Sequence, residues 1–164
     1  MLMYFMGYPY YYAYPVIHVH DLAHPNRNQQ PIDHGSKPSV VNIHEAAKEN
    51  KFFRTALWTG EHLQVTLMHI DIGDDIGLEI HPDTDQFLRI EQGQALVQMG
   101  DKPNQLTINQ HANEDYAIII PAGTWHNVIN MGHVPLKLYS IYAPPHHPFG
   151  TIHKTKQEAM EEEH

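Results

Sequence analysis

The chain has 164 residues, of which 41% are hydrophobic, and it contains no cysteine. This length and composition are typical of a single globular domain, and the lack of cysteine excludes disulfides, thiolate metal sites and a cysteine nucleophile. The formal net charge of −9, from 10 Lys and Arg against 19 Asp and Glu, argues against a nucleic-acid partner, because a phosphate backbone is bound by a basic face. No apolar run approaches the ~18 residues of a membrane span.

Residues 1–40 predict an irregular arm followed by a linker. The first 16 residues are rich in Tyr, Met and Pro, have no helix or strand period, and carry no Lys or Arg, so they do not predict a signal peptide. Two interpretations stay open: a loosely packed arm, or an adhesive segment for self-association or coat assembly. We expect a cytoplasmic protein, with the spore coat as the alternative location.

Residues 42–50 predict a short helix. Asn42 is a good N-cap residue, Glu45 follows three positions later, and Asn50 stands near the end. We expect this helix to pack on the outside of a β domain that spans residues 41–152.

From residue 52 onward the pattern changes to short β-favouring runs separated by Gly, Pro, Asn and Asp. Even spacing with no alternating helices predicts an all-β sandwich or barrel. Residues 153–164 form a charged tail that predicts either a short helix or a frayed end. The expected strands are Phe52–Trp58, Leu63–Ile72, Gly77–His81, Phe87–Glu91, Ala95–Met99, Ala117–Ile120, Trp125–Ile129 and Leu136–Tyr142.

Two segments place polar side chains where they can converge. Glu79 and His81 are two residues apart on an expected strand, so both leave the same face, and Gln86 opens the next strand after a turn. In the second segment, the turn from Pro121 to Gly123 delivers His126 to the start of another strand. A barrel that brings these strands together would gather four polar side chains inside.

These spacings resemble the two motifs of the cupin superfamily. Gly73 and Gly93 bracket the first motif, in which Glu79 stands where His is usual and Gln86 where Glu is usual. In the second motif the family residues are all present except the leading Gly, which is Asp115; they are Pro121, Gly123, His126 and Asn130. The resemblance covers residues 52–145 and implies a single jelly-roll barrel.

The resemblance also implies a divalent metal ion held by Glu79, His81, Gln86 and His126. Two imidazoles and one carboxylate suit Fe(II), while Mn, Ni and Zn are also tolerated by such a set. Gln86 could be a fourth ligand, a hydrogen-bond partner of a ligand, or a substrate contact. The alternative is a metal-free barrel whose polar residues only hydrogen-bond to one another.

Three residues on expected strands are candidates for substrate binding or catalysis: Arg54, Lys137 and Tyr139. An inward Arg54 or Lys137 could hold a phosphate or carboxylate group, although an outer-face solvated charge is the alternative for each. His146 and His147 follow two prolines and are expected at the surface.

Stretches such as residues 53–60 and 139–145 resemble small cupins described as similar to phosphomannose isomerase. This implies a metal-dependent sugar or sugar-phosphate isomerase acting on a small carbohydrate or organic acid. The alternatives are an Fe(II)-dependent dioxygenase and a non-catalytic coat or assembly protein. The resemblance further implies a homodimer.

Overall fold

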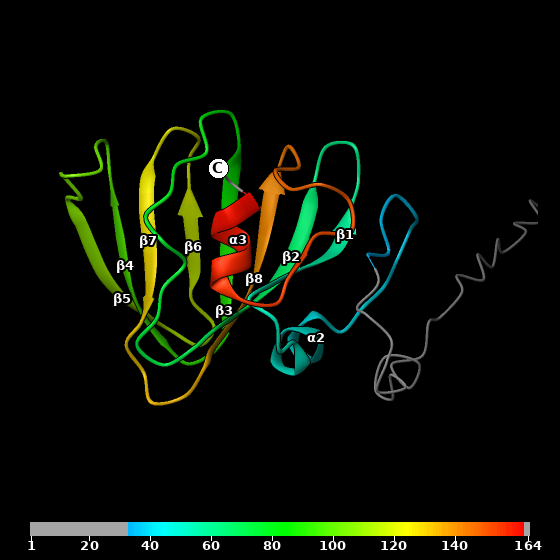
Figure 1. The fold of residues 1–164 in the computed structure, drawn as a ribbon, viewed down its shortest axis with the longest axis horizontal. Helices are drawn as coiled ribbons and strands as arrows, with labels where there is room; N and C mark the ends of the chain where they lie inside the picture. The colour runs from blue at the N-terminus through cyan, green and yellow to red at the C-terminus, as the bar shows by residue number, and fades with distance from the viewer. Residues whose placement is uncertain (1–32, 163–164) are drawn as a thin grey trace, which may run out of the picture.

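The computed structural model describes residues 33–162, which form two antiparallel sheets closed into a jelly-roll barrel (Figure 1). One sheet has six strands in the order β6-β3-β8-β2-β1-β9, and the other has three in the order β5-β4-β7. The Tyr-rich arm predicted for residues 1–16 lies outside the described residues, so its proposed role in assembly stays a prediction.

The element bounds agree well with the expected strands in the middle of the chain. The six-stranded sheet contains β1 (Arg54–Thr59), β2 (Gln64–Ile70), β3 (Asp85–Gln92), β6 (Ala117–Ile120), β8 (Leu136–Ala143) and β9 (Ile152–His153). The three-stranded sheet contains β4 (Gln94–Gly100), β5 (Ile108–Asn113) and β7 (Trp125–Asn130).

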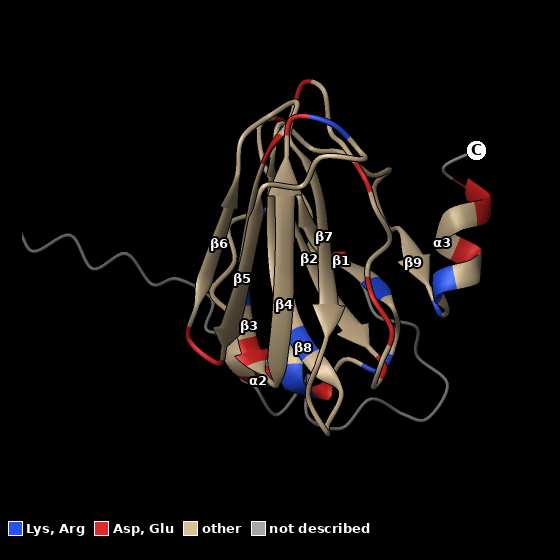
Figure 2. Cartoon of the chain, turned by 90° about the vertical axis from the view of Figure 1, so that its left-hand side faces the viewer, with Lys and Arg blue, Asp and Glu red and all other residues tan. Residues whose placement is uncertain are grey.

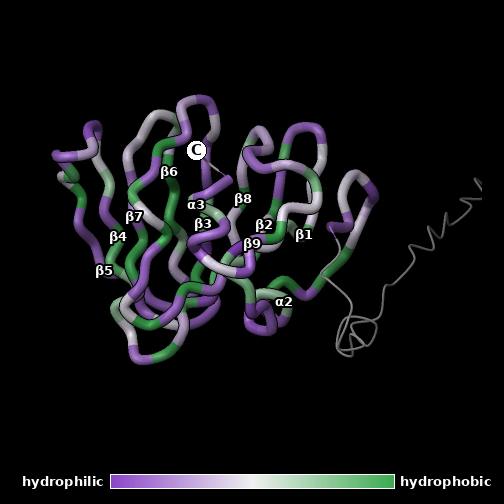
Figure 3. The backbone as a smooth tube through the Cα atoms, viewed as in Figure 1, coloured by the Kyte–Doolittle hydropathy of each residue, from purple (hydrophilic) through white to green (hydrophobic). Residues whose placement is uncertain are grey.

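Alternation along the strands builds an interior with an apolar part and a polar part. Figure 3 shows hydrophobic and hydrophilic residues interleaved along the sheets. On β8, Leu136 and Leu138 are fully buried in the apolar core, and Ser140 and Tyr142 continue the same face and are equally buried. The apolar part also contains Met68, Ile70, Leu88, Ile90, Val97, Ile118 and Val128, from both sheets. The barrel therefore carries its buried polar side chains toward the far end of β8.

The predicted helix is confirmed as α2 (Ile43–Glu49), with Asn42 as N-cap accepting a hydrogen bond from the Glu45 N–H at 3.3 Å. It contacts β8, β2 and β3. Ala47 packs there with Leu57 and Leu67 in a second, smaller apolar cluster. The outer face of the six-stranded sheet is thus covered by α2, as expected.

Three elements differ from the expectation. Gly77–His81 is not a strand: Glu79 makes only an isolated antiparallel bridge with His126. β5 was not predicted because its sequence is polar and five of its six residues are exposed. β9 was not predicted either, because it has two residues and is defined only by its pairing with β1.

The end of the chain forms a second helix, α3 (Lys156–Glu162), which lies beside β9 at the edge of the barrel (Figure 2). Lys156 ties it to the loop after β2, since Nζ donates to Asp74 Oδ1 at 2.8 Å and also to Asp75 Oδ1. Among the described residues, no helix is long and apolar enough to cross a membrane.

Candidate metal centre

Three side chains with metal-binding atoms converge at the polar end of the barrel. Glu79 Oε1 lies 3.3 Å from His81 Nε2 and 3.2 Å from His126 Nε2. One possible ligand atom from each of the three residues lies within 4.8 Å of the others. Among the described residues, these three form the cluster of His and acidic side chains that could hold a metal ion. His126 is fully buried, and the Glu79 side chain keeps 13% of its surface exposed. The centre is therefore enclosed but still reached by solvent.

The backbone holds Glu79 opposite His126. The Glu79 N–H donates to the His126 carbonyl at 3.0 Å, and the His126 N–H donates to the Glu79 carbonyl at 2.9 Å. The loop before Glu79 continues this pairing, because the Ile76 N–H donates to the Val128 carbonyl at 3.1 Å. Two of the three candidate ligands are thus placed by main-chain hydrogen bonds.

The hydrogen bond of His126 on its other nitrogen favours metal binding. Its Nδ1 lies 2.8 Å from the carbonyl oxygen of Thr124, an acceptor, so Nδ1 carries a proton. In a neutral imidazole with this tautomer, the Nε2 lone pair would face the Glu79 carboxylate, which also has only lone pairs to offer. A cation between the two atoms, either a proton or a metal ion, makes the arrangement favourable.

Burial by itself raises the pKa of the Glu79 carboxyl. Hydrogen bonds with His126 and His81 and the positive charge of Arg54 outweigh that effect, so the pKa of Glu79 lies well below its usual range. Glu79 is therefore an anion at neutral pH, the form that a metal ligand needs.

Gln86 is a candidate for a fourth donor at the same end of the barrel interior. It is 2% exposed at the start of β3, and its Nε2 donates to Ser140 Oγ at 3.0 Å. Its Oε1 is buried and has no hydrogen-bond partner among the described residues. A buried amide oxygen without a donor is costly, and a metal ion would satisfy it. The residues present therefore fit a divalent ion.

Arg54, one of the three catalytic candidates, is inside the barrel. It is 1% exposed, its Nη2 lies 4.0 Å from Glu79 Oε2, and its Nη1 lies 3.5 Å from His153 Nδ1. His153 in turn lies 2.7 Å, through Nε2, from Oε2 of Glu162 on α3. The inward alternative, rather than a solvated outer-face charge, holds for Arg54.

The loop after β8 packs against the centre, which sequence reasoning missed. The buried side chain of Gln64 accepts from the His147 N–H and donates to the His147 carbonyl, both at 2.9 Å. The His146 ring lies 4.1 Å from the ring of His81, centroid to centroid. His146 is exposed as expected, but the surface position predicted for His147 is wrong, since that residue is only 7% exposed.

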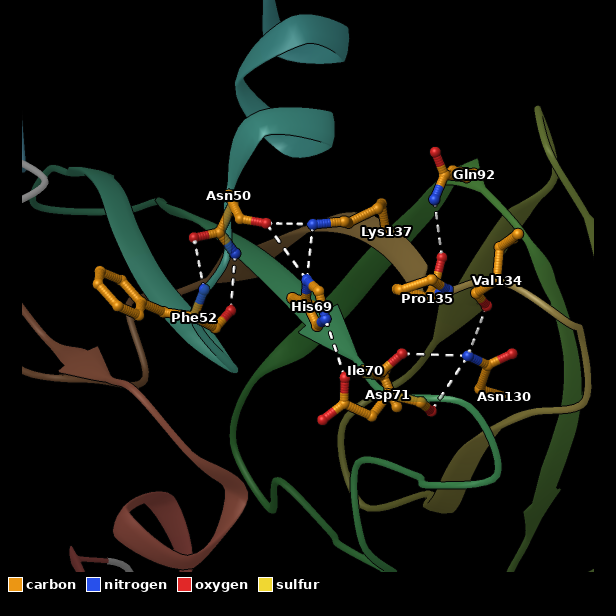
Figure 4. A network of polar contacts seen from close by, with 10 residues as sticks. All are labelled: Asn50, Phe52, His69, Ile70, Asp71, Gln92, Asn130, Val134, Pro135 and Lys137. Atoms are coloured by element: carbon orange, nitrogen blue, oxygen red, sulfur yellow. Dashed lines mark hydrogen bonds and ion pairs between the residues drawn. The ribbon is translucent and has the colours of Figure 1, made fainter. Parts of the chain in front are cut away.

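Lys137 and Tyr139 do not join this cluster. Lys137 Nζ donates to the carbonyl of Asn50, just after α2, and lies 2.6 Å from His69 Nδ1 (Figure 4). Tyr139 packs on the α2 side of the sheet, with its ring 6.3 Å from that of Phe87. Both residues alternate with the inward-facing Leu138, so they point to the outer face of the barrel.

The second motif also contains a structural residue. Asn130 is buried, and its Nδ2 faces three carbonyl oxygens, those of Ile70, Asp71 and Val134, at 3.0–3.1 Å (Figure 4). It fastens the end of β7 to the end of β2. Asn130 therefore has a structural role, four residues after the candidate ligand His126.

Comparisons with known proteins agree with this geometry. A family model described as a cupin domain matches residues 66–142. The YrkC protein of Bacillus subtilis (strain 168) is 61% identical over 138 residues, covering 84% of this chain and 74% of YrkC. Protein L612 of Acanthamoeba polyphaga mimivirus is 40% identical over 122 residues, covering 74% of each chain.

Solved structures show the same fold. The crystal structure of BH2720 from Bacillus halodurans is 63% identical, with a TM-score of 0.79 and coverage of 79% of this chain and 98% of that one. The crystal structure of TT1209 from Thermus thermophilus, at 20% identity and a TM-score of 0.56, covers 65% of this chain and 98% of that one and supports the fold alone.

Proposed function

Since this chain belongs to the cupin superfamily, we propose that it holds one divalent metal ion through Glu79, His81 and His126, with Gln86 as a fourth donor. The observation that carries this proposal is the convergence of the Glu79 carboxylate with two imidazole nitrogens at 3.2–3.3 Å. The ion would bind and polarise an oxygen of a small-molecule substrate. Fe, Mn, Ni and Zn are the candidate ions for this ligand set, and elemental analysis distinguishes them.

Elemental analysis of natively purified protein tests the site. We expect about one metal ion per chain in the wild type, and loss of the metal in both Glu79→Ala and His126→Ala. Glu61→Ala and His62→Ala are matched controls, because each of these side chains is 87% exposed, and both should keep the metal. Metal retained in Glu79→Ala and in His126→Ala would show that the ligands are different residues.

The reaction we infer first is an isomerase-like one on a small sugar or sugar phosphate. It needs a metal-bound carbonyl oxygen and a group that moves a proton. Lys137 is not the group we propose, because it points to the outer face, where it contacts Asn50 and His69. Arg54 remains in place to attract an anionic substrate. Metal-loaded protein that leaves a panel of aldose and ketose phosphates unchanged would remove this reaction.

A specific observation favours a second reaction, Fe(II)-dependent oxygenation. Two histidines and one carboxylate form the ligand set of non-haem Fe(II) oxygenases. Anaerobic loading with Fe(II), followed by oxygen uptake in the presence of candidate substrates, is the test. Substrate-dependent uptake that disappears in Glu79→Ala supports it, and no uptake across the panel counts against it.

A further inference from the structure

We propose that the metal-bound substrate is a small organic anion, and that Arg54 and His147 form the site for its carboxylate or phosphate group beside the metal. This inference rests on the proposed metal function. It is carried by the charge of the enclosed centre and by a buried imidazole with a vacant hydrogen-bonding nitrogen.

The first argument is the charge. A divalent ion held by the proposed ligands would, together with the Arg54 guanidinium, bring three positive charges to the polar end of the barrel, and Glu79 supplies one negative charge. Gln86 is neutral where a carboxylate would have removed another positive charge. Glu162 pairs with His153 but is 65% exposed, so solvent screens it. An enclosed site with an excess of positive charge binds an anion in preference to a neutral ligand.

The second argument is His147. Burial lowers the pKa of His147 to about 2, and the positive charge of Arg54 acts in the same direction, so the ring is neutral. Its Nε2 is buried and has no hydrogen-bond partner among the described residues. The ring stands edge-on to Tyr142 at 5.0 Å, and Tyr142 in turn stands edge-on to His81 at 5.6 Å. The ring that carries the vacant nitrogen is therefore linked through Tyr142 to His81, one of the proposed metal ligands.

The third argument is the placement of the loop. Gln64 is fully buried, and its side chain forms hydrogen bonds with both the backbone N–H and the backbone carbonyl of His147. These two hydrogen bonds hold the backbone of His147 and leave the ring atom Nε2 unused. A side chain held in this way with its own nitrogen unused is preorganised for a ligand. A neutral imidazole can donate one hydrogen bond to an oxyanion, and Arg54 supplies the opposing charge.

Ligand titration of the Co(II)-loaded protein, followed by the visible absorption of the ion, tests the proposal. The anionic probes are lactate and glycerol 3-phosphate, and the matched neutral probes are 1,2-propanediol and glycerol. We expect at least one anion to bind ten-fold or more tightly than its neutral partner. The stronger of the two anions identifies the source of the oxyanion as a carboxylate or a phosphate.

Two variants test the named residues. His147→Phe keeps an aromatic ring but removes Nε2, and we expect about ten-fold weaker anion binding with Co(II) still at one per chain. The control is His62→Phe, the same substitution at an exposed site, which should bind the anion as the wild type does. Arg54→Gln should weaken the binding of the anionic probes and leave the binding of the neutral probes unchanged.

Three outcomes would overturn the inference alone while the metal centre stands. They are equal binding of anionic and neutral probes, unchanged anion binding in His147→Phe, and unchanged anion binding in Arg54→Gln, each with Co(II) bound. Failure of the wild type to bind Co(II) or any other divalent ion would instead overturn the proposed function and this inference with it.

Discussion

Glu79 and His126 are joined twice, by a pair of backbone hydrogen bonds of 3.0 and 2.9 Å and by the 3.2 Å approach of their side chains. They lie 47 positions apart in the sequence. The backbone pair belongs to the loop after β2 that runs along β7, so the relative position of these two ligands depends on how firmly that loop is held. The loop is also held by α3, through Lys156, which donates to Asp74 and Asp75.

The first prediction concerns that contact. Lys156 donates to Asp74 and Asp75, and these contacts raise the pKa of Lys156 above its usual value although its burial alone lowers it. Asp75 also accepts from Asn127, the residue after His126, at 3.2 Å. We expect Lys156→Met to lower the free energy of unfolding by about 1 kcal/mol and to weaken metal binding several-fold, as measured by competition with a chromophoric chelator.

Lys156→Arg should keep both properties, because it preserves the charge and the donors. Lys154→Met, at an exposed position in the same segment, is the matched control. If Lys156→Met lost stability but bound the metal as tightly as the wild type, α3 would only stabilise the barrel and would not position Glu79.

The second prediction concerns Gln86. The buried Oε1 without a partner becomes a carboxylate oxygen in Gln86→Glu, a better metal ligand. We expect metal binding to tighten about ten-fold or more. The metal-free protein should become less stable, because two buried carboxylates, Glu79 and the new one, then repel each other. Thermal unfolding with and without the metal measures both effects, and a variant with unchanged metal affinity would place Gln86 outside the ligand set.

The third prediction concerns Lys137, which is 6% exposed. Its Nζ donates to the Asn50 carbonyl and contacts His69 Nδ1 (Figure 4). Lys137→Met removes the ammonium group that contacts the Asn50 carbonyl and His69 Nδ1, and leaves these two groups only their 3.4 Å contact with each other. We expect it to lower the free energy of unfolding by about 1–3 kcal/mol, measured by urea titration, and to leave the metal content unchanged. A folded variant that loses its metal would instead reveal an unexpected link from the outer face to the centre.

Much of the fold could be predicted from the sequence because turn residues and alternation bound most strands. β5 could not, since Ile108–Asn113 is polar and exposed at all but one position and derives its strand character from pairing with β4. Gly77–His81 looked like a strand, but the segment makes a single bridge at Glu79. Local patterns do not reveal which partner a segment will pair with.

The site was predicted in part. The donors Glu79, His81 and His126 were implied by the resemblance to the cupin motifs, and the structure brings them together. The positions of Lys137 and His147 could not be predicted in the same way. Strand alternation places Lys137 on the face opposite Leu138, but only the tertiary structure shows that α2 covers that face. The burial of His147 depends on Gln64, which is 83 positions away.

The fourth prediction is a pH dependence of stability that belongs to His147. Its folded pKa is lowered to about 2 by burial and by Arg54, against an ordinary value of 6.5. Between those values the unfolded chain binds more protons than the folded one, so stability falls as the pH falls. Relative to His147→Phe, the wild type should lose about 1 kcal/mol of unfolding free energy between about pH 7.5 and 5.5.

The measurement is urea unfolding of both proteins at the two pH values, with excess chelator present so that proton competition at the metal ligands does not contribute. The other groups that act on His147, namely Arg54, His146, Glu79 and His153, are present in both proteins and cancel in the difference. Parallel pH profiles of the wild type and the variant would contradict the prediction.

The position of β8 between β2 and β3 has a consequence for biosynthesis. A chain leaves the ribosome from its N-terminus, so β2 and β3 are made long before residues 136–143 arrive to join them, and Gln64 waits for His147. Until then the six-stranded sheet lacks β8, the strand between β3 and β2, and the barrel around Glu79 is not closed. A metal ion held by Glu79, His81 and His126 would therefore be taken up by the completed chain, after its release from the ribosome.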